Sequence, residues 1–372
     1  MKKLGLVALL LLSAAPAIAA ENPASIPFDT DVNFLKMPDD LHLGEVAGVA
    51  VNSRGNIFVF HRGSTDGPAY GGRAAQLLEF GPNGNFIREI GRNLYAWSYA
   101  HTVRVDAQDN IWVADKGSDM VIKFNPQGRA VMMLGRKPEA SDEFAHPLEH
   151  PDPPLPAIDG LFRQVTDMTF DPQGNIYVSD GYINSRVAKY DRDGNWLMQW
   201  GDRGQYEGNT EPPTGRMFQP HTIASDAQGN IYVGDRANRR IQVFNGNGQF
   251  QRVIRIDVTA PAGMKPVIGN VPNPNAVNKS QLPGAPWALC ITPGPNQVLY
   301  SSDSYPGRIY KLTLDGRLLG QVGELGRTPG KFAWIHEIAC PSENNLLVAE
   351  LLSWRVSKLT LRPTAQQRAD SK

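Results

Sequence analysis

The sequence predicts an all-β fold, a six-bladed β-propeller in one domain. One phrase recurs six times along the chain, and within it apolar residues alternate with polar ones, as in half-buried strands. No stretch of helical periodicity of useful length separates the copies. The 36 glycines and 29 prolines are spread along the chain, which indicates many short turns. A single sheet of this kind would expose its faces and edges, whereas six sheets packed radially bury them.

Each copy consists of an apolar strand, a turn, a second strand ending in an acidic position, and a third strand. The turns DPQGN and DAQGN supply the positive-φ positions that tight hairpins require. The copies follow one another at intervals of roughly 50 to 65 residues. They read VAVNSRGNIFVFHRG at 49–63, VRVDAQDNIWVADKG at 103–117, MTFDPQGNIYVSDGY at 168–182, IASDAQGNIYVGDRA at 223–237, CITPGPNQVLYSSDS at 290–304 and IACPSENNLLVAELL at 338–352.

The two ends of the chain lie outside the repeats. Residues 1–19 combine two lysines, an apolar run and a small-residue cleavage site, as in a secretory signal peptide, so we expect a periplasmic or secreted protein. Residues 20–43 form an N-terminal segment that closes the ring, with 34–43 adding a strand to the last blade. The propeller then spans 44–362, and 363–372 is a C-terminal tail.

The composition of the chain argues against some classes of binding partner. The chain has 37 basic and 37 acidic residues without basic blocks, which argues against a nucleic-acid partner. No run after the signal peptide is long and apolar enough to predict a membrane span. We expect a monomer that binds a small-molecule or peptide substrate with a carboxylate. The two cysteines, Cys290 and Cys340, are predicted to be a free buried pair, because one bridge would add little to so large a core.

The repeats resemble NHL repeats in one further detail. In four blades the acid is followed five or six residues later by an arginine and then by a strand. We interpret these pairs as structural ion pairs that brace each blade rather than as catalytic groups. They are Asp180 and Arg186, Asp235 and Arg240, Asp303 and Arg308, and Glu350 and Arg355.

Three histidines share one position in the repeat. His101, His221 and His336 each lie 14 residues before the acid of blades 2, 4 and 6. Alternate blades of a six-bladed ring are related by 120°, so the three imidazoles should converge on the axis. Three histidines with an open fourth position suit a catalytic zinc or iron. The alternative is that each is a hydrogen-bonded channel histidine. The same position in the odd blades holds Ala47, Thr166 and Trp287.

The remaining four histidines do not share this position. His146 and His150 are predicted to be loop residues in the proline-rich insert EFAHPLEHPDPPLP, since without a helix their spacing has no meaning. His42 and His61 have no partner by this count, and His61, at the acid position of blade 1, is predicted to be structural.

Residues that follow each blade's acid should face one end of the channel. Arg62 of blade 1 and Arg236 of blade 4 stand there, on opposite sides of the ring, where they would hold a carboxylate or an oxyanion. Tyr182 of blade 3 and Tyr305 of blade 5 come one residue later. A tyrosine close to a metal and a cation can have its pKa lowered enough to act as a base.

These segments resemble the peptidyl-α-hydroxyglycine α-amidating lyase family. The resemblance rests on GRNLYAWSYAHTVRVD, VSDGYINSR, QPHTIASD and GDRANRRIQVF, and it runs from about residue 44 to 255 and again at 330–360. It implies a six-bladed propeller that binds zinc, or another divalent metal, through three histidines and carries a structural calcium. It also implies cleavage of a peptide ending in α-hydroxyglycine to the peptide amide and glyoxylate.

The resemblance assigns roles to individual residues. It gives the zinc to His101, His221 and His336, and the catalytic roles to Tyr182, Arg62 and Arg236. It gives the calcium to the backbone carbonyls of Val49 and Val103 and to the carboxylate of Glu337. The chain departs from the family pattern in places: of the three zinc strands only Pro220-His221 keeps the usual Pro-His, and Glu337 stands where aspartate is usual.

Two other functions remain open from the sequence. One is a different metal-dependent propeller hydrolase of the lactonase kind, although such sites use several carboxylates around calcium where this chain has histidines. The other is a non-catalytic periplasmic NHL binding propeller, which would hold no stoichiometric metal.

Overall fold

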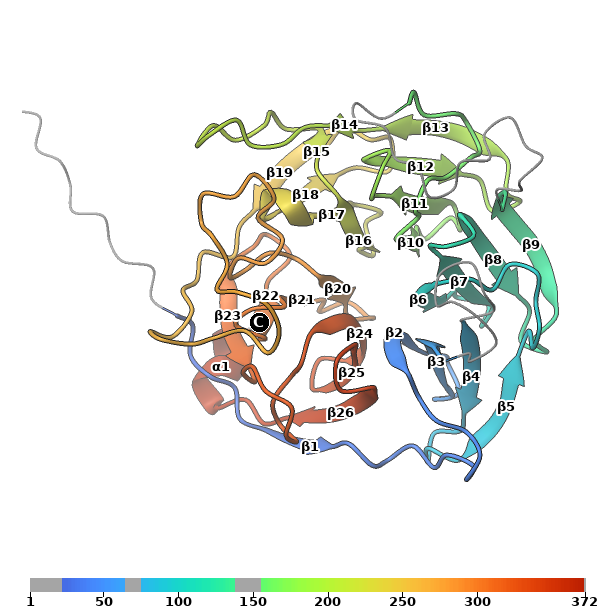
Figure 1. Ribbon diagram of the computed structural model, residues 1–372, viewed down its shortest axis with the longest axis horizontal. Coiled ribbons are helices and arrows are strands. Elements are labelled where there is room, and N and C mark those ends of the chain that lie inside the picture. The colour runs from blue at the N-terminus through green and yellow to red at the C-terminus, as the bar shows by residue number, and fades with distance from the viewer. Residues whose placement is uncertain (1–21, 64–74, 138–154, 371–372) are drawn as a thin grey trace, which may run out of the picture.

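The structure, a computed structural model, describes residues 22–63, 75–137 and 155–370. It confirms the predicted six-bladed β-propeller: six four-stranded sheets stand around a central channel, as Figure 1 shows. The first strand of each repeat lies innermost. No helix in the described part of the chain is long and apolar enough to cross a membrane.

Blades 1 to 3 follow the chain from the innermost to the outermost strand. Blade 1 consists of β2 (Glu45–Val51), β3 (Ile57–Arg62), β4 (Gln76–Phe80) and β5 (Phe86–Ile90). Blade 2 consists of β6 (Ala100–Val105), β7 (Ile111–Asp115), β8 (Met120–Phe124) and β9 (Ala130–Gly135). Blade 3 consists of β10 (Asp167–Phe170), β11 (Ile176–Asp180), β12 (Arg186–Tyr190) and β13 (Trp196–Trp200).

The second half of the ring has the same plan with small additions. Blade 4 consists of β16 (Pro220–Ser225), β17 (Ile231–Asp235), β18 (Arg240–Phe244) and β19 (Phe250–Ile254), with the 3-10 turn η1 (Arg236–Asn238) between β17 and β18. Blade 5 consists of β20 (Ala288–Ile291), β21 (Leu299–Ser302), β22 (Ile309–Leu312) and β23 (Leu318–Val322). The short strands β14 (Asp202–Arg203) and β15 (Arg216–Met217) pair in parallel before blade 4.

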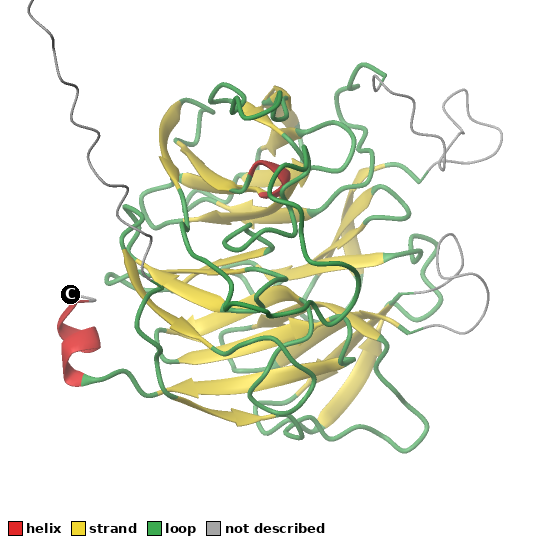
Figure 2. Ribbon diagram, turned by 60° about the vertical axis from the view of Figure 1, so that its left-hand side comes forward, coloured by secondary structure: helices red, strands yellow, loops and turns green. Residues whose placement is uncertain are grey.

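Blade 6 closes the ring with a strand from the N-terminal segment. Its own strands are β24 (Ile335–Ser342), β25 (Asn345–Glu350) and β26 (Arg355–Leu361). The fourth is β1 (Phe28–Asp31), which pairs antiparallel with the outer edge of β26 (Figure 1). The helix α1 (Ala365–Asp370) lies outside the ring, as Figure 2 shows.

The prediction that residues 34–43 supply the closing strand was therefore wrong. The apolar side chains of this segment, including Phe34, Leu35 and Leu41, pack into the core between blades 6 and 1 instead of alternating across a strand. The segment's backbone touches blade 1 at one point, where the Lys36 N–H donates to the carbonyl of Gly84 at 2.7 Å.

An aspartate at the start of the turn in blades 2, 3 and 4 explains why the phrase recurs in these blades. Asp171 accepts the backbone N–H of Asn175 at 2.9 Å and the side-chain amide of the same residue at 2.7 Å. Its second oxygen also accepts the Tyr177 hydroxyl at 2.8 Å, which ties the turn to the second strand. Asp106 and Asp226 build the same arrangement in blades 2 and 4. Such Asx-type turns offer the backbone a local hydrogen-bond partner and so fix the hairpin.

The core is divided into six apolar clusters, one between each pair of neighbouring blades. Between blades 1 and 2, for example, Phe58 and Phe60 of β3 pack with Val113 of β7 and Ile122 of β8. Each blade therefore buries both of its faces, which is the reason for the ring that the sequence predicted.

Three of the four predicted ion pairs form. They are Asp180 with Arg186 at 2.9 Å, Asp235 with Arg240 at 2.8 Å, and Glu350 with Arg355 at 2.8 Å. In blade 5 Asp303 instead accepts the backbone N–H of Arg308 at 2.9 Å, and the Arg308 guanidinium donates to the carbonyl of Thr259 at 3.2 Å. A backbone contact thus replaces the side-chain pair in this blade.

The two cysteines form a disulfide, so the prediction of a free pair was wrong. Cys290 lies on β20 and Cys340 on β24, the inner strands of blades 5 and 6, and their Cα atoms are 6.0 Å apart. The free pair was predicted from the size of the core. A disulfide depends instead on the distance between the two cysteines, which the neighbouring strands set here.

Reduction of this disulfide is expected to lower the free energy of unfolding by about 2–4 kcal/mol, because it releases a loop closed over 50 residues in the unfolded chain. Denaturant unfolding of the wild type with and without reductant measures the loss. The Cys290→Ser/Cys340→Ser variant should unfold like the reduced wild type and should no longer respond to reductant. An oxidised wild type no more stable than this variant would contradict the expectation.

Candidate metal centre

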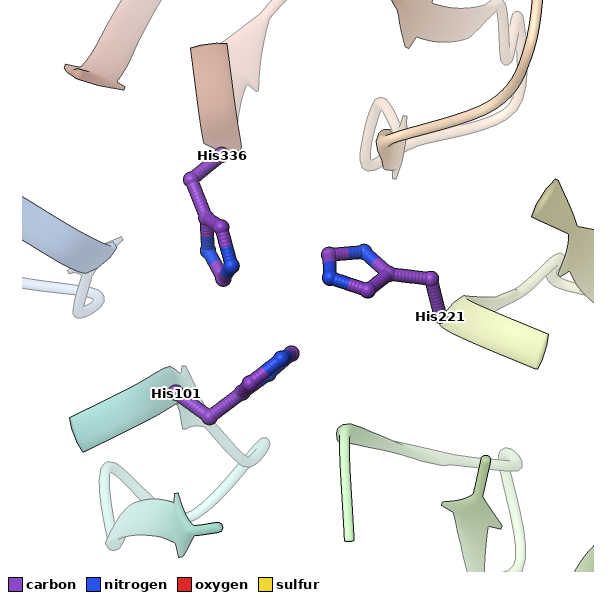
Figure 3. A group of neighbouring side chains, drawn as sticks. All are labelled: His101, His221 and His336. Carbon is purple, nitrogen blue, oxygen red and sulfur yellow. The ribbon is translucent and has the colours of Figure 1, made fainter. Parts of the chain in front are cut away.

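Three histidines, one from each even-numbered blade, converge in the channel (Figure 3). His101, His221 and His336 are the second residues of β6, β16 and β24. The three distances between their ring centroids are 4.7, 4.8 and 4.9 Å, so the group is close to threefold symmetric. One nitrogen from each ring lies within 4.8 Å of the others. The structure thus brings together the set that the shared register predicted.

A β-bulge lies at each of these histidines. Pairing between the first and second strand of the blade skips the histidine, passing from Ala100 to Thr102, from Pro220 to Thr222, and from Ile335 to Glu337. An unpaired bulge residue departs from the regular in-and-out alternation of the strand, and bulges commonly re-aim side chains at functional sites. The bulge is therefore the local feature that turns each imidazole toward the axis.

Each imidazole is also held by the next odd-numbered blade. Nδ1 of His101 lies 2.6 Å from the carbonyl of Thr166, that of His221 2.8 Å from the carbonyl of Trp287, and that of His336 2.7 Å from the carbonyl of Ala47. A carbonyl only accepts, so Nδ1 carries the proton and Nε2 presents a lone pair. This second contact is the one that orients histidines which ligate metals.

The imidazoles are in the ionisation state that metal binding needs. Burial first, and then the charges of neighbouring groups, holds the pKa of all three histidines well below its ordinary value, although the backbone carbonyl at Nδ1 opposes the shift. The three imidazoles line a small cavity together with Arg104, Asp167, Trp287 and Glu337. Three neutral Nε2 donors are the protein ligands of a catalytic zinc ion, which keeps its fourth position open.

The hydroxyl of Tyr182 lies next to the three histidines. Its oxygen lies 3.5 Å from Nε2 of His101, and its ring stands edge-on to those of His101 and His221. Burial alone would raise the pKa of Tyr182, but the positive charges of Arg236, Lys116 and Arg62 outweigh it and bring the pKa below its ordinary value. The Tyr182 hydroxyl therefore loses its proton more easily than an ordinary tyrosine does.

Arg236 is buried over the site with hydrogen-bond donors to spare. It is 3 % exposed, and its guanidinium carbon lies 4.1 Å from the ring centroid of Trp287 and 5.3 Å from that of Tyr182. One terminal nitrogen donates to Gln219 at 2.9 Å, whereas Nε and Nη1 find no hydrogen-bond acceptor among the described residues. An anionic group placed here would accept hydrogen bonds from these two buried nitrogens.

Arg62 faces the same mouth but is already partnered. Its guanidinium stacks 3.9 Å from the ring centroid of Tyr99, donates to the carbonyl of Ala100 at 3.1 Å, and pairs with Glu45 at 2.6 Å. Its charge still contributes to the low pKa values of Tyr182 and His336. Arg62 therefore acts on the site through its positive charge. A carboxylate that bound to Arg62 would compete with Glu45.

Lys116 is a third cation at this mouth, which the sequence reasoning missed. Its ammonium lies 4.1 Å from the ring centroid of Tyr182 and 5.3 Å from that of Tyr99. Lys116 directly follows Asp115, the acid of blade 2, so it shares the register position from which Arg62 and Arg236 were selected. Applying that count to every blade would have found it.

Other sequence candidates lie elsewhere. Tyr305 donates its hydroxyl to the carbonyl of Met264 at 2.9 Å. His61 is fully buried and accepts the backbone N–H of Gly44 at 3.1 Å, in keeping with a structural role. His42 is exposed. His146 and His150 lie outside the described residues.

The residues expected to hold calcium do meet, but around a different cation. The Glu337 carboxylate accepts the backbone N–H groups of Val49 and Val103, each at 3.3 Å, and its other oxygen lies 3.1 Å from the guanidinium of Arg104. Calcium needs six to eight oxygen ligands at about 2.3–2.6 Å. With a guanidinium on the carboxylate, these residues do not fit that ion.

Comparison with known proteins shows which families the chain resembles. The NHL repeat family matches residues 219–244, the segment that contains His221 and Arg236. Over 355 residues the chain is 26% identical to the peptidyl-alpha-hydroxyglycine alpha-amidating lyase 1 of Drosophila melanogaster. Over 220 residues it is 29% identical to the peptidyl-glycine alpha-amidating monooxygenase of Mus musculus. The chain is similar in sequence to the amidating lyases. This confirms the resemblance that the sequence segments indicated.

The alignments cover only part of these relatives. The alignment covers 88% of this chain and 59% of the fly lyase, and 54% of this chain and 20% of the mouse monooxygenase. The chain thus spans about a fifth of the length of the mouse relative. The similarity to amidating lyases supports the prediction that the protein is an enzyme.

Solved structures agree on the fold alone. The virginiamycin B lyase of Staphylococcus aureus has a TM-score of 0.54 at 12% identity over 90% of this chain and 100% of its own. The gluconolactonase XC5397 of Xanthomonas campestris has a TM-score of 0.55 at 15% identity over 95% of this chain and 99% of its own. At such identities the likeness shows only that all three are propellers.

Proposed function

We propose that this protein is a zinc-dependent carbon–nitrogen lyase that cleaves an N-acyl- or peptidyl-α-hydroxyglycine to an amide and glyoxylate. The observation that carries the proposal is the convergence of three neutral Nε2 atoms next to a tyrosine whose pKa is lowered by neighbouring cations and a buried arginine with two nitrogens that are unpaired among the described residues. The relationship to a named lyase supports the choice of reaction.

The substrate's carboxylate would be held by Arg236. Its Nε and Nη1 have no acceptor among the described residues, and they lie in a buried setting where a charge-assisted bond is strong. Trp287, on which the guanidinium stacks, fixes its orientation. Arg62 would add a second positive charge on the opposite side of the channel, in exchange for part of its pairing with Glu45.

Zinc held by His101, His221 and His336 would supply Lewis acidity to an oxygen of the substrate. Tyr182 would take the proton of the α-hydroxyl. The C–N bond then breaks with its electron pair leaving on nitrogen, the hydroxyl carbon becomes the aldehyde of glyoxylate, and the nitrogen takes up a proton to give the amide. Burial of Arg236 would keep bulk water from competing with the substrate for its guanidinium.

The lactonase-like alternative finds less support in the channel. Such a site needs several carboxylates free to bind a metal, and the two next to the histidine ring, Asp167 and Glu337, are both engaged by Arg104. The non-catalytic alternative differs from the lyase in one measurable respect, since it requires no turnover and no bound metal.

The test is release of glyoxylate from an N-acyl-α-hydroxyglycine by the zinc-loaded protein. The proposal expects turnover well above a Tyr182→Phe control, and loss of turnover after chelation with recovery on added zinc. Glyoxylate release no faster than in the control would sink the lyase assignment and leave the metal site standing.

We also propose that the protein acts as a monomer outside the cytoplasm, in the periplasm or secreted. The disulfide between Cys290 and Cys340 supports the location outside the cytoplasm, because such bonds persist in oxidising compartments.

Replacing Lys116 by methionine is expected to raise the pKa of Tyr182, because one of the cations that lower it is removed. If the phenolate is the base, activity is lost as pH falls through that pKa. The acidic limb of the pH–rate profile should therefore move to higher pH in Lys116→Met. Lys116→Arg keeps the charge and should leave the limb in place. An acidic limb unmoved in Lys116→Met would show that Lys116 does not act through Tyr182.

A further inference from the structure

A second charged group lies next to the histidine ring, and the proposed reaction does not use it. Arg104, three residues after His101 on β6, forms two bonds to Asp167, with Nε to Oδ1 at 2.9 Å and Nη2 to Oδ2 at 2.6 Å. Its Nη1 lies 3.1 Å from Glu337. The side chain of Arg104 is 16 % exposed and those of the two acids 3 %. One cation thus bridges two buried carboxylates.

This group of three, which we call the channel triad, touches the inner strand of every blade. Arg104 belongs to β6, Asp167 to β10 and Glu337 to β24. Glu337 accepts the N–H of Val49 on β2 at 3.3 Å. Asp167 accepts the N–H of Ile223 and the hydroxyl of Thr222 on β16, both at 3.0 Å, and Arg104 donates to the carbonyl of Leu289 on β20 at 3.4 Å.

The two acids of the triad are sequence neighbours of residues that form or hold the histidine group. Glu337 follows His336, and Thr222 follows His221. Asp167 follows Thr166, the residue whose carbonyl holds Nδ1 of His101. A shift of either carboxylate would therefore move a strand that sets the separation of the three imidazoles.

The strands approach closely around Glu337. A Cβ atom on Gly48 would stand 2.8 Å from the Glu337 carboxylate and 2.7 Å from the backbone nitrogen of Val103. Only glycine lets β2 lie this close to β6, so the two backbone N–H groups can both reach the same carboxylate oxygen. Oε2 of Glu337 thus faces two N–H donors, whereas Oε1 makes no hydrogen bond within the described part of the chain and lies 3.1 Å from Nη1 of Arg104, so the guanidinium holds this oxygen through its charge.

We propose that Arg104 is the central cation of this propeller, in the role that the family resemblance gives to a structural calcium, and that through Asp167 and Glu337 it positions the three histidine strands. The channel is then held by a side chain, and the fold is independent of calcium. The inference does not rest on the lyase reaction, because calcium binding and melting temperature are measured without substrate.

The first arm of the test uses the wild-type protein and calcium chloride alone. Equilibrium dialysis against radioactive calcium should find no stoichiometric binding, and the melting temperature should be the same with calcium and with a calcium chelator. One calcium ion bound per chain, with a matching rise in melting temperature, would overturn the proposal.

The second arm compares Arg104→Met with Arg104→Lys. Removing the charge leaves two buried carboxylates unpaired, so Arg104→Met should melt about 5–10 °C lower, recover with added calcium, and bind zinc roughly 10- to 100-fold more weakly in a calorimetric titration. Arg104→Lys keeps the charge and should stay independent of calcium. An Arg104→Met protein that melts like the wild type, or an Arg104→Lys protein that needs calcium, would contradict the proposal. If Arg104→Met fails to fold, the wild-type and lysine arms still decide.

Discussion

Replacement of His221 by alanine is expected to remove the bound zinc and with it all measurable turnover. His221 supplies one of three converging nitrogens, and its Nε2 has no hydrogen-bond partner among the described residues. Loss of a residue that merely orients a ligand weakens metal binding by about 10- to 100-fold, so loss of a ligand should cost more than that. Zinc per chain after gel filtration and glyoxylate release are the two readouts.

His61 provides the matched control for this variant. It is another fully buried histidine, but it lies on β3 and accepts a backbone N–H of Gly44 rather than facing the other imidazoles. His61→Ala should keep its zinc even if its melting temperature falls. Retention of a full zinc ion by His221→Ala, or equal loss from both variants, would mean that the three imidazoles do not form the metal site.

Replacement of Tyr182 by phenylalanine is expected to lower kcat by about 10²- to 10⁴-fold, the range typical of a lost general base. The ring, its packing against the histidines and the stacking cations remain, so zinc content and KM should stay near the wild-type values. Rapid-quench or steady-state assays of glyoxylate release separate kcat from KM.

Tyr99→Phe is the control for this prediction. Tyr99 also lies at the mouth, beneath the guanidinium of Arg62, and burial raises its pKa rather than lowering it. Its variant should lose far less activity than Tyr182→Phe. A Tyr182→Phe enzyme within about tenfold of the wild type would remove Tyr182 from the chemistry and transfer the role of base to another group.

The fold was predictable because the same strand–turn–strand pattern recurs in each copy of the repeat. The aspartate of the turn in blades 2, 3 and 4, such as Asp171, binds the turn's own backbone, and this can be predicted from a window of a few residues. Ring closure could not be read in the same way. Phe28–Asp31 is a short strand whose partner, β26, lies at the other end of the chain, while the more apolar segment around Phe34 packs in the core.

The histidines were predictable because residues at the same position of each repeat lie close together around the axis of the ring. The count gave His101, His221 and His336, and even their hydrogen-bond partners occupy the same position in the odd blades. Arg104 was not predictable, because its importance depends on acids in blades 3 and 6 that only the closed ring brings to it. The bond between Cys290 and Cys340 likewise depends on the contact of two inner strands.

One measurement tests the central claim most directly: an anomalous difference map from a crystal of the purified, zinc-loaded protein, recorded above and below the zinc absorption edge. We expect a single peak at the common reach of Nε2 of His101, His221 and His336, with a fourth position open toward Tyr182, and no peak within the channel triad of Arg104, Asp167 and Glu337. Absence of a peak between the histidines in protein that contains zinc, or a peak at another place on the molecule, would contradict the account.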